Sequence, residues 1–125
     1  RQIIKSAMTE IMRETCAYTD SSYVQLAPID GCWAVVGRIG GSLSVDKSCI
    51  SRGVVMHELL HTIGFFHEQS RSDRDRYVII YWKNIDDDDA NQFTKMSLSE
   101  TNVLSTEYDY DSIMHYGQYA FTKNG

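Results

Sequence analysis

Two stretches of the chain repeat apolar residues at the spacing of one face of an α-helix. In residues 2–15 the charged residues fall outside the apolar stripe, which predicts a packing helix without chemistry of its own. A second stripe follows Ser51, a residue type that caps helix N-termini, and predicts a helix that ends at about Ile63. The apolar positions are Ile4, Ala7, Met8, Ile11 and Met12 in the first helix and Val54, Val55, Leu59, Leu60 and Ile63 in the second.

Three short segments between these helices have the alternation and the turn signals of β-strands: residues 23–27, 33–39 and 42–45. We expect the last of them to be an edge strand. An edge strand beside an active site can pair with an extended peptide. The alternative, the plain border of a sheet, fits the sequence equally well.

The chain after the second helix is polar and has few regular elements. Residues 69–76 carry charges of alternating sign; such a run is usually a solvated loop, but its ion pairs could brace the segment before it. Residues 77–82 are apolar and strand-like or extended, and residues 97–107 are loop-like. The four acids at 86–89 suit the first turn of a helix through Phe93, because acids complement the helix dipole. A calcium site is the weaker alternative there, since no EF-hand spacing accompanies the acids.

Composition narrows the classes of function. The chain has 125 residues, 42% hydrophobic and 23% charged, which suits one globular unit. Its net charge of −5 argues against nucleic acid as a partner. No apolar run approaches the roughly 20 residues that cross a bilayer, and no signal-peptide pattern is present. Because Arg1 begins directly in a helical pattern and Gly125 ends in loop chemistry, we expect both ends to be cut from a longer chain.

The strongest chemical signal is the run HELLHTIGFFH, which begins at His57. His57 and His61 are one helical turn apart, so both imidazoles can reach one cation, while Glu58 can face a metal-bound water without being a ligand. Gly64 suits the left-handed end of a helix, after which His67 can approach the same metal. Three neutral histidines leave one position of Zn²⁺ open, as in catalytic sites. The alternative, ordinary histidines on an amphipathic helix, does not account for the glycine and the third histidine.

The chain has three cysteines, an odd number. Cys32 and Cys49 bracket the strands before the second helix and could close that segment as a disulfide. Cys16 is then left over, and an odd cysteine suggests a partner outside the chain. The alternative is that all three are reduced, buried thiols of a cytosolic protein.

A second motif, SIMHY at residues 112–116, follows the histidine run. Metzincin peptidases combine a long zinc motif with a downstream methionine turn. The histidine run continues as EQSRSDRD at residues 68–75, and it is preceded by GCW at residues 31–33 and VGR at residues 36–38. Together these motifs resemble the astacin family of metzincin zinc metallopeptidases, with its meprin and tolloid relatives, over nearly the whole chain.

The resemblance implies a fold and a set of site residues. The implied fold is α+β, the metzincin zinc-peptidase fold, with a small sheet and a long zinc-binding helix above a loop-rich lower part. The implied zinc ligands are His57, His61 and His67. By the same resemblance, Glu58 is the general base and later the proton donor. Tyr116 resembles the family's switch tyrosine, a weak fifth ligand that swings away and stabilises the tetrahedral intermediate.

The resemblance also assigns supporting roles. Met114 forms an apolar floor beneath the metal, and Glu68 receives the mature N-terminus through water. Cys32 and Cys49 correspond to a disulfide of the family. Cys16 corresponds to a cysteine that pairs with one near the domain's C-terminus, which lies outside this chain.

Single residues of the second motif indicate an active site less strongly than the two motifs together. Met114 alone suits plain core, and Tyr116 alone suits a surface tyrosine; only their combination with the histidine run favours the site. His115 lies between them; we assign it no metal and expect it either to support the site residues or to be structural.

These features predict a zinc endopeptidase that hydrolyses peptide bonds in proteins, and the resemblance implies that it is secreted as a zymogen. Its partner is a protein or peptide substrate, and this chain itself makes no membrane contact; the sequence indicates no oligomeric state. Residues 1–125 are expected to be part of an astacin-like catalytic domain without its N-terminal strand and C-terminal part, and the stretch between Cys16 and Tyr23 is shorter than in familiar members. Two alternatives are an inactive zinc-holding binding domain, against which Glu58 and Tyr116 count, and a zinc hydrolase acting on compounds other than peptides.

Overall fold

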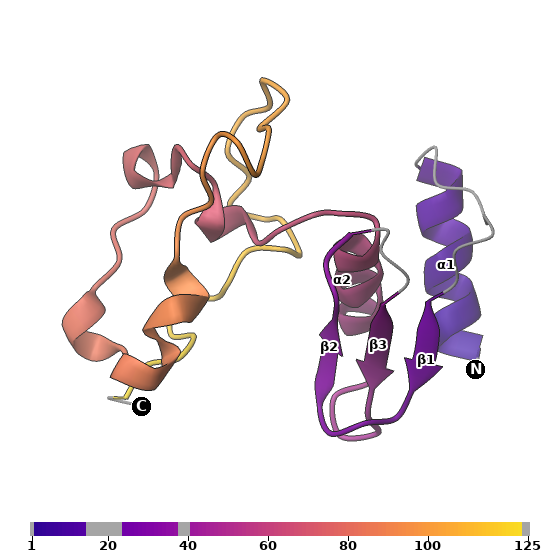
Figure 1. Ribbon diagram of the computed structural model, residues 1–125. Helices are drawn as coiled ribbons and strands as arrows, with labels where there is room; N and C mark the ends of the chain where they lie inside the picture. Colours follow the sequence, from indigo (N-terminus) through magenta and orange to yellow (C-terminus); the bar gives the residue numbers. More distant parts are fainter. Residues whose placement is uncertain (1, 15–23, 38–40, 124–125) are drawn as a thin grey trace. The chain divides into compact units, whose positions relative to one another are not determined.

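The computed structural model describes residues 2–14, 24–37 and 41–123 (Figure 1). The chain forms two compact units, residues 1–65 and residues 66–125, and each is described by itself. In the described parts of the chain, no helix is both long enough and apolar enough to cross a membrane.

The first unit contains all the strands and both α-helices of the described residues. Its elements in chain order are α1 (Gln2–Glu14), β1 (Gln25–Ala27), β2 (Cys32–Ala34), β3 (Ser42–Val45) and α2 (Arg52–Thr62). Helix α1 confirms the predicted packing helix and buries Ala7 and Ile11. It packs against α2, and an ion pair between Glu10 and Arg52 links the two helices. Helix α2 also contacts β2 and β3.

Strand β3 is the middle strand of the sheet, whose order is β1-β3-β2 (Figure 1). It runs parallel to β1 and antiparallel to β2. Leu43 and Ser44 face opposite sides of the sheet and are both fully buried, as in strands covered on both faces. The prediction that residues 42–45 form an edge strand is therefore wrong. Strand pairing depends on residues distant in sequence, so a four-residue pattern does not show which neighbours a strand acquires.

The other two strands are shorter than predicted. Strand β2 ends at Ala34, although the sequence pattern continues to residue 39. Beyond it, Gly37 has φ +94° and donates its N–H to the carbonyl oxygen of His61 at 2.9 Å, so the chain turns from the sheet to the end of α2. Residues 23 and 38–40, where the predicted strands begin or end, lie outside the described residues.

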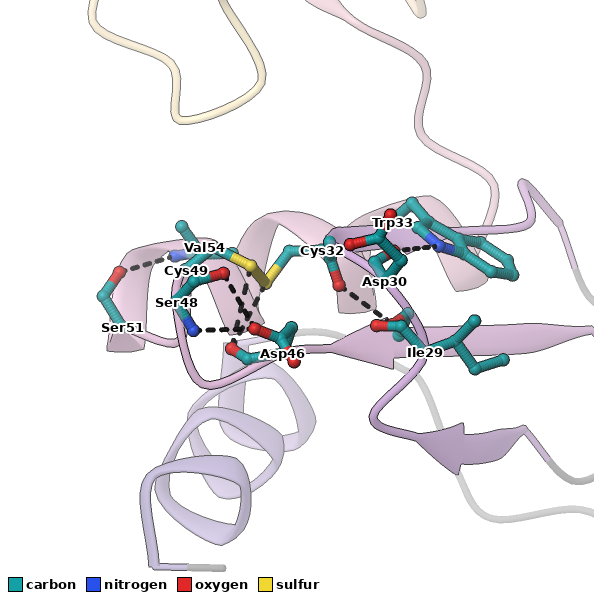
Figure 2. Close-up of a disulfide and its surroundings, with 11 residues drawn as sticks. Ile29, Asp30, Cys32, Trp33, Asp46, Ser48, Cys49, Ser51 and Val54 are labelled. Atoms are coloured by element: carbon teal, nitrogen blue, oxygen red, sulfur yellow. Dashed lines mark hydrogen bonds between the residues drawn. A yellow bond between two sulfur atoms is a disulfide. The ribbon is translucent and has the colours of Figure 1, made fainter.

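A disulfide joins Cys32 of β2 to Cys49 in the loop before α2, as predicted (Figure 2). Within that loop Asp46 accepts hydrogen bonds from the backbone N–H of Ser48 at 2.9 Å and from its hydroxyl at 2.8 Å. These bonds hold the pKa of Asp46 below its usual value. The loop that leads into α2 is thus fixed both covalently and by its own turn. Cys16 lies outside the described residues.

The second unit consists of loops and short 3₁₀-helices. These are η1 (Glu68–Ser70), η2 (Arg74–Arg76), η3 (Trp82–Asn84) and η4 (Asp87–Phe93). Helix η4 follows Asp86, so the acidic run begins a helix as predicted, of the 3₁₀ type. Among the described residues of this unit the one β-bridge joins Ile85 to Thr122. The α+β fold with a loop-rich second part is confirmed.

Aromatic and polar side chains together form the core of the second unit. The Phe93 ring lies edge-to-face against three other rings, with centroid distances of 5.7 Å to Tyr116, 5.9 Å to Phe121 and 6.3 Å to Trp82. Two polar residues, Gln69 and Arg74, are 2% and 4% exposed. A unit with so little regular structure must satisfy its backbone polar groups in other ways, and these side chains contribute to that.

Candidate metal centre

Helix α2 positions the first two histidines. Ser51 caps it, because its hydroxyl accepts the backbone N–H of Val54 at 3.2 Å. The helix ends at Ile63, followed by Gly64 with φ +108°, as predicted. Its buried positions are Val55, Glu58, His61 and Thr62, whereas the other predicted apolar positions, Val54, Leu59, Leu60 and Ile63, are half-buried.

His57 and His61 are oriented toward one point. Their Nε2 atoms are 3.1 Å apart, and the rings lie edge-to-face with centroids 4.7 Å apart. Two nitrogens bound tetrahedrally to one zinc, with bonds of about 2.0 to 2.1 Å, are about 3.3 Å from each other. The pair therefore fits two ligands of one zinc ion.

The backbone selects the tautomer of His61 that can bind a metal. Its Nδ1 is 2.7 Å from the carbonyl oxygen of Phe65, which only accepts hydrogen bonds, so Nδ1 carries the proton. The lone pair is then on Nε2, the atom that faces His57. Burial lowers the pKa of His61, which further favours the neutral, ligating form. A backbone carbonyl is a common outer partner of metal-binding histidines.

Glu58 is a buried acid next to this pair. It is 5% exposed, and its Oε2 has no hydrogen-bond partner among the described residues. Burial raises the pKa of Glu58, and His57 partly opposes that effect. An unpartnered buried carboxylate oxygen is costly to stability and is typically retained for a functional reason. Its place beside two metal-oriented imidazoles fits a group that handles the proton of an activated water.

His67 completes the predicted ligand set. His57, His61 and His67 are the one group of three or more His, Cys, Asp or Glu residues able to hold a metal ion in the part of the chain that the structure describes. His67 directly precedes η1, with φ −65° and ψ 143°. Three imidazoles, one of them with a fixed tautomer, fit zinc in a site with an open position.

Tyr116 lies against the third histidine within the second unit. The rings of Tyr116 and His67 have centroids 4.4 Å apart, tilted by 49°. The phenol donates to Gln92 Oε1 at 3.5 Å, a long hydrogen bond. The residue that the sequence linked to the site only by resemblance is thus adjacent to a predicted ligand.

Glu68 connects the histidine run to the second motif. Its backbone N–H donates to the carbonyl oxygen of Met114 at 3.0 Å, and Met114 is 3% exposed. Its Oε1 accepts from Arg71 at 3.0 Å and from the backbone N–H of Asp109 at 2.9 Å. Glu68 therefore holds the methionine turn at Met114 and the segment that precedes the turn at Asp109. The implied contact of Glu68 with a mature N-terminus remains a prediction.

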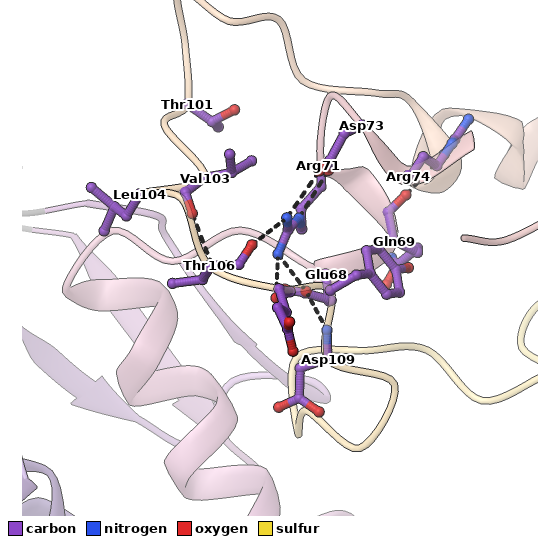
Figure 3. Close-up of polar contacts among 12 residues, drawn as sticks. Glu68, Gln69, Arg71, Asp73, Arg74, Thr101, Val103, Leu104, Thr106 and Asp109 are labelled. Carbon is purple, nitrogen blue, oxygen red and sulfur yellow. Dashed lines mark hydrogen bonds and ion pairs between the residues drawn. The ribbon is translucent and has the colours of Figure 1, made fainter. Parts of the chain in front are cut away.

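Arg71 braces this region, as the sequence suggested (Figure 3). Its guanidinium makes two parallel hydrogen bonds with Asp73, both 3.0 Å long, and a third with Glu68. It also donates to the carbonyl oxygens of Thr106 at 3.0 Å and Glu107 at 2.9 Å. The hydrogen bond between Arg71 and Asp73 lowers the pKa of Asp73 and raises the pKa of Arg71, to which Glu68 also contributes. One side chain thus joins two loops that are distant in sequence.

The sequence missed two buried polar residues in the same run. Gln69 Oε1 accepts the backbone N–H of Tyr116 at 3.1 Å. Arg74 donates to the carbonyl oxygen of Gln69 at 3.0 Å and also to that of Phe93, with its guanidinium over the Trp82 ring. In the sequence both residues belong to a polar, charged stretch, and no hydrophobic pattern marks them as buried.

His115 has partners at both ring nitrogens. Nδ1 is 2.7 Å from the carbonyl oxygen of Tyr116, so it carries the proton, and Nε2 accepts the phenol proton of Tyr108 at 2.8 Å. Burial raises the pKa of Tyr108 to about 12, so the phenol stays protonated. Both ring nitrogens of His115 are thus bound within the protein, which fits the expectation that His115 supports the site residues or is structural.

The chain was compared with known protein families and sequences. The family model described as Astacin (Peptidase family M12A) matches residues 1–125. The zinc metalloproteinase nas-13 of Caenorhabditis elegans is 46% identical over 133 aligned residues, which cover 100% of this chain and 30% of the relative. Meprin A subunit alpha of Rattus norvegicus is 43% identical over 107 residues, which cover 84% of this chain and 14% of the relative. The chain thus spans less than a third of the length of either relative.

Solved structures agree with these matches. High choriolytic enzyme 1, a hatching enzyme zinc-protease from Oryzias latipes, superposes with a TM-score of 0.88 at 40% identity, over 98% of this chain and 64% of that one. Myroilysin shares the fold, with a TM-score of 0.62 at 22% identity. The chain therefore belongs to the astacin family, peptidase family M12A, a family of zinc-dependent proteases, and its three histidines are positioned to bind a metal.

Proposed function

We propose that the protein containing this chain is a zinc endopeptidase that hydrolyses peptide bonds in proteins, and that residues 1–125 are part of its catalytic domain. The observation that carries the proposal is the buried Glu58 Oε2, which has no partner among the described residues and lies beside two metal-oriented histidines. A site that only stored zinc would not need an unpaired acid at this place.

His57, His61 and His67 would hold the zinc ion, which would supply Lewis-acid chemistry for the scissile carbonyl and would lower the pKa of a water to about 7. Glu58 accepts the proton of that water as it attacks, and later delivers the proton to the leaving amine. The raised pKa of Glu58 supports this role, because a carboxylate with a higher pKa is a stronger base.

Tyr116 is the second catalytic residue of the proposal. Its ring lies against that of His67, which supports a phenol near the metal. With zinc bound, the phenol would serve as a weak fifth ligand at rest and would donate a hydrogen bond to the developing oxyanion during the reaction. Met114 provides an apolar floor for the site, a role supported by its burial.

The substrate is a protein or a peptide, and we propose that the enzyme is secreted as a zymogen. The Cys32–Cys49 disulfide supports an oxidising compartment. Relatives named zinc metalloproteinase and hatching enzyme zinc-protease support peptide bonds as the target.

The test is proteolysis by the activated full-length protein. A mixture of peptides is incubated with the protein alone, with a zinc chelator, and with chelator followed by excess zinc, and the products are identified by mass spectrometry. We expect internal cleavages that the chelator abolishes and zinc restores. Zinc binding without any cleavage would indicate a binding domain, and turnover of other esters or amides alone would indicate a different hydrolase.

A further inference from the structure

Gln69 is a neutral polar side chain that is almost completely buried. It is 2% exposed and belongs to η1, the turn that directly follows His67. Its side-chain oxygen accepts the backbone N–H of Tyr116 at 3.1 Å. Since an N–H only donates, the atom of Gln69 that faces Tyr116 must be the oxygen.

The nitrogen of the Gln69 side-chain amide makes no hydrogen bond to the described residues. Nε2 is buried and has no acceptor among the described residues. A buried amide nitrogen left unpaired costs stability, so packing alone would favour an apolar side chain of similar length. The oxygen, and its bond to Tyr116, is therefore the feature that accounts for a glutamine here.

The backbone of Tyr116 is held on both sides. Gln69 accepts its N–H at 3.1 Å, and His115 Nδ1 donates to its carbonyl oxygen at 2.7 Å. Arg74 fixes Gln69 in turn, by donating to its carbonyl oxygen and to that of Phe93, whose ring packs against Tyr116. The phenol is thus located by a turn that begins at the third histidine.

We propose that Gln69 is a positioning residue of the active site, which sets the place of the Tyr116 phenol relative to His67 through the Tyr116 backbone. This inference rests on the proposed role of Tyr116 in peptide hydrolysis. A hydrogen bond that the phenol makes only in the transition state affects kcat, so a displaced Tyr116 lowers kcat and leaves KM nearly unchanged.

Two variants of the full-length protein test the contribution of the Gln69 side-chain oxygen. Gln69→Met keeps the length of the side chain and removes the acceptor, whereas Gln69→Glu keeps an oxygen at the same place. We expect the Tyr116 amide proton of Gln69→Met to exchange at least about tenfold faster in NMR, and that of Gln69→Glu to stay protected. The control is Gln118→Met, an exposed glutamine near Tyr116, which should leave the exchange rate unchanged. Unchanged exchange in Gln69→Met, or lost protection in a folded Gln69→Glu, overturns the proposal.

Kinetics in two backgrounds tests the route through the phenol. Gln69→Met should lower kcat by about 10- to 100-fold, the scale of a misplaced catalytic group, with Gln69→Glu restoring most of it. In the Tyr116→Phe background the same substitution should have almost no further effect on kcat. An equal loss in both backgrounds shows that Gln69 does not act through Tyr116, while peptidase activity itself stands. If the parent protein cleaves no peptide, the proposed function fails, and amide exchange still decides whether Gln69 holds Tyr116.

Discussion

Glu68 donates its backbone N–H to the carbonyl oxygen of Met114 at 3.0 Å, and this bond joins the histidine run to the methionine turn. Gln69 and Arg71, in the same run, reach the backbone of Tyr116 and of the loop at residues 106–107. The second unit has no sheet among its described residues, so side-chain hydrogen bonds to the backbone perform the joining that strand pairing performs in the first unit.

Glu58→Gln should retain zinc and lose activity. Glutamine matches glutamate in shape but cannot take a proton, so the rate should fall by about 10² or more, the scale of a lost general base. Zinc content by atomic absorption and turnover of a cleaved peptide are measured on the same preparation. Loss of zinc together with activity would assign Glu58 to metal binding and remove it from the chemistry.

Tyr116→Phe should lower kcat by about 10²- to 10³-fold, as expected for one lost oxyanion donor. KM, zinc content and melting temperature should stay close to the parent values, because the ring and its contacts with His67 and Phe93 remain. A lower melting temperature with normal kcat would instead identify a purely structural tyrosine.

Removing the disulfide with Cys32→Ser and Cys49→Ser together should lower the free energy of unfolding by about 3 kcal/mol, the chain-entropy value for a loop of this length. Chemical denaturation of the full-length protein measures it. Non-reducing peptide mapping of the parent is the companion experiment: Cys32 and Cys49 should be found together, and Cys16 with a cysteine outside residues 1–125. A link from Cys16 to either of the other two contradicts the assignment.

Arg71→Met should destabilise the second unit, because Asp73 and two backbone carbonyls lose the Arg71 donor, while Glu68 retains its bond from the Asp109 N–H. The free energy of unfolding should fall by about 1 to 3 kcal/mol, since hydrogen bonds to charged groups contribute more to stability than hydrogen bonds between neutral groups. Arg76→Met is the matched control, because Arg76 is exposed, and it should cost much less.

The loss of unfolding free energy caused by Arg71→Met should also depend on pH. Arg71 holds the pKa of Asp73 below its ordinary value of 3.8 in the folded protein. The stabilisation from this carboxylate is therefore fully present above about pH 4 and is lost as the pH falls through the lowered pKa. Urea denaturation of the parent and of Arg71→Met at several pH values should show curves that approach each other in acid. A difference that grows on acidification would contradict the pairing.

The sequence by itself determined the two α-helices and the spacing of the candidate metal ligands. Helix α1 follows from apolar periodicity, and the ends of α2 follow from Ser51 and Gly64, because helix formation depends on residues within a few positions. The four-residue spacing of His57 and His61 converts directly into two ring nitrogens 3.1 Å apart. A motif whose members lie within one helix needs no tertiary information.

Tertiary structure alone decided the features that join distant segments. Strand β3 is central because β1 and β2 both pair with it, and no pattern within residues 42–45 reports those partners. Gln69 and Arg74 are buried because Tyr116 and Phe93 supply partners for them from far along the chain. In sequence they are ordinary polar residues of a charged run. Burial of a polar group is stable only where its partners are assembled, and that assembly exists only in the folded chain.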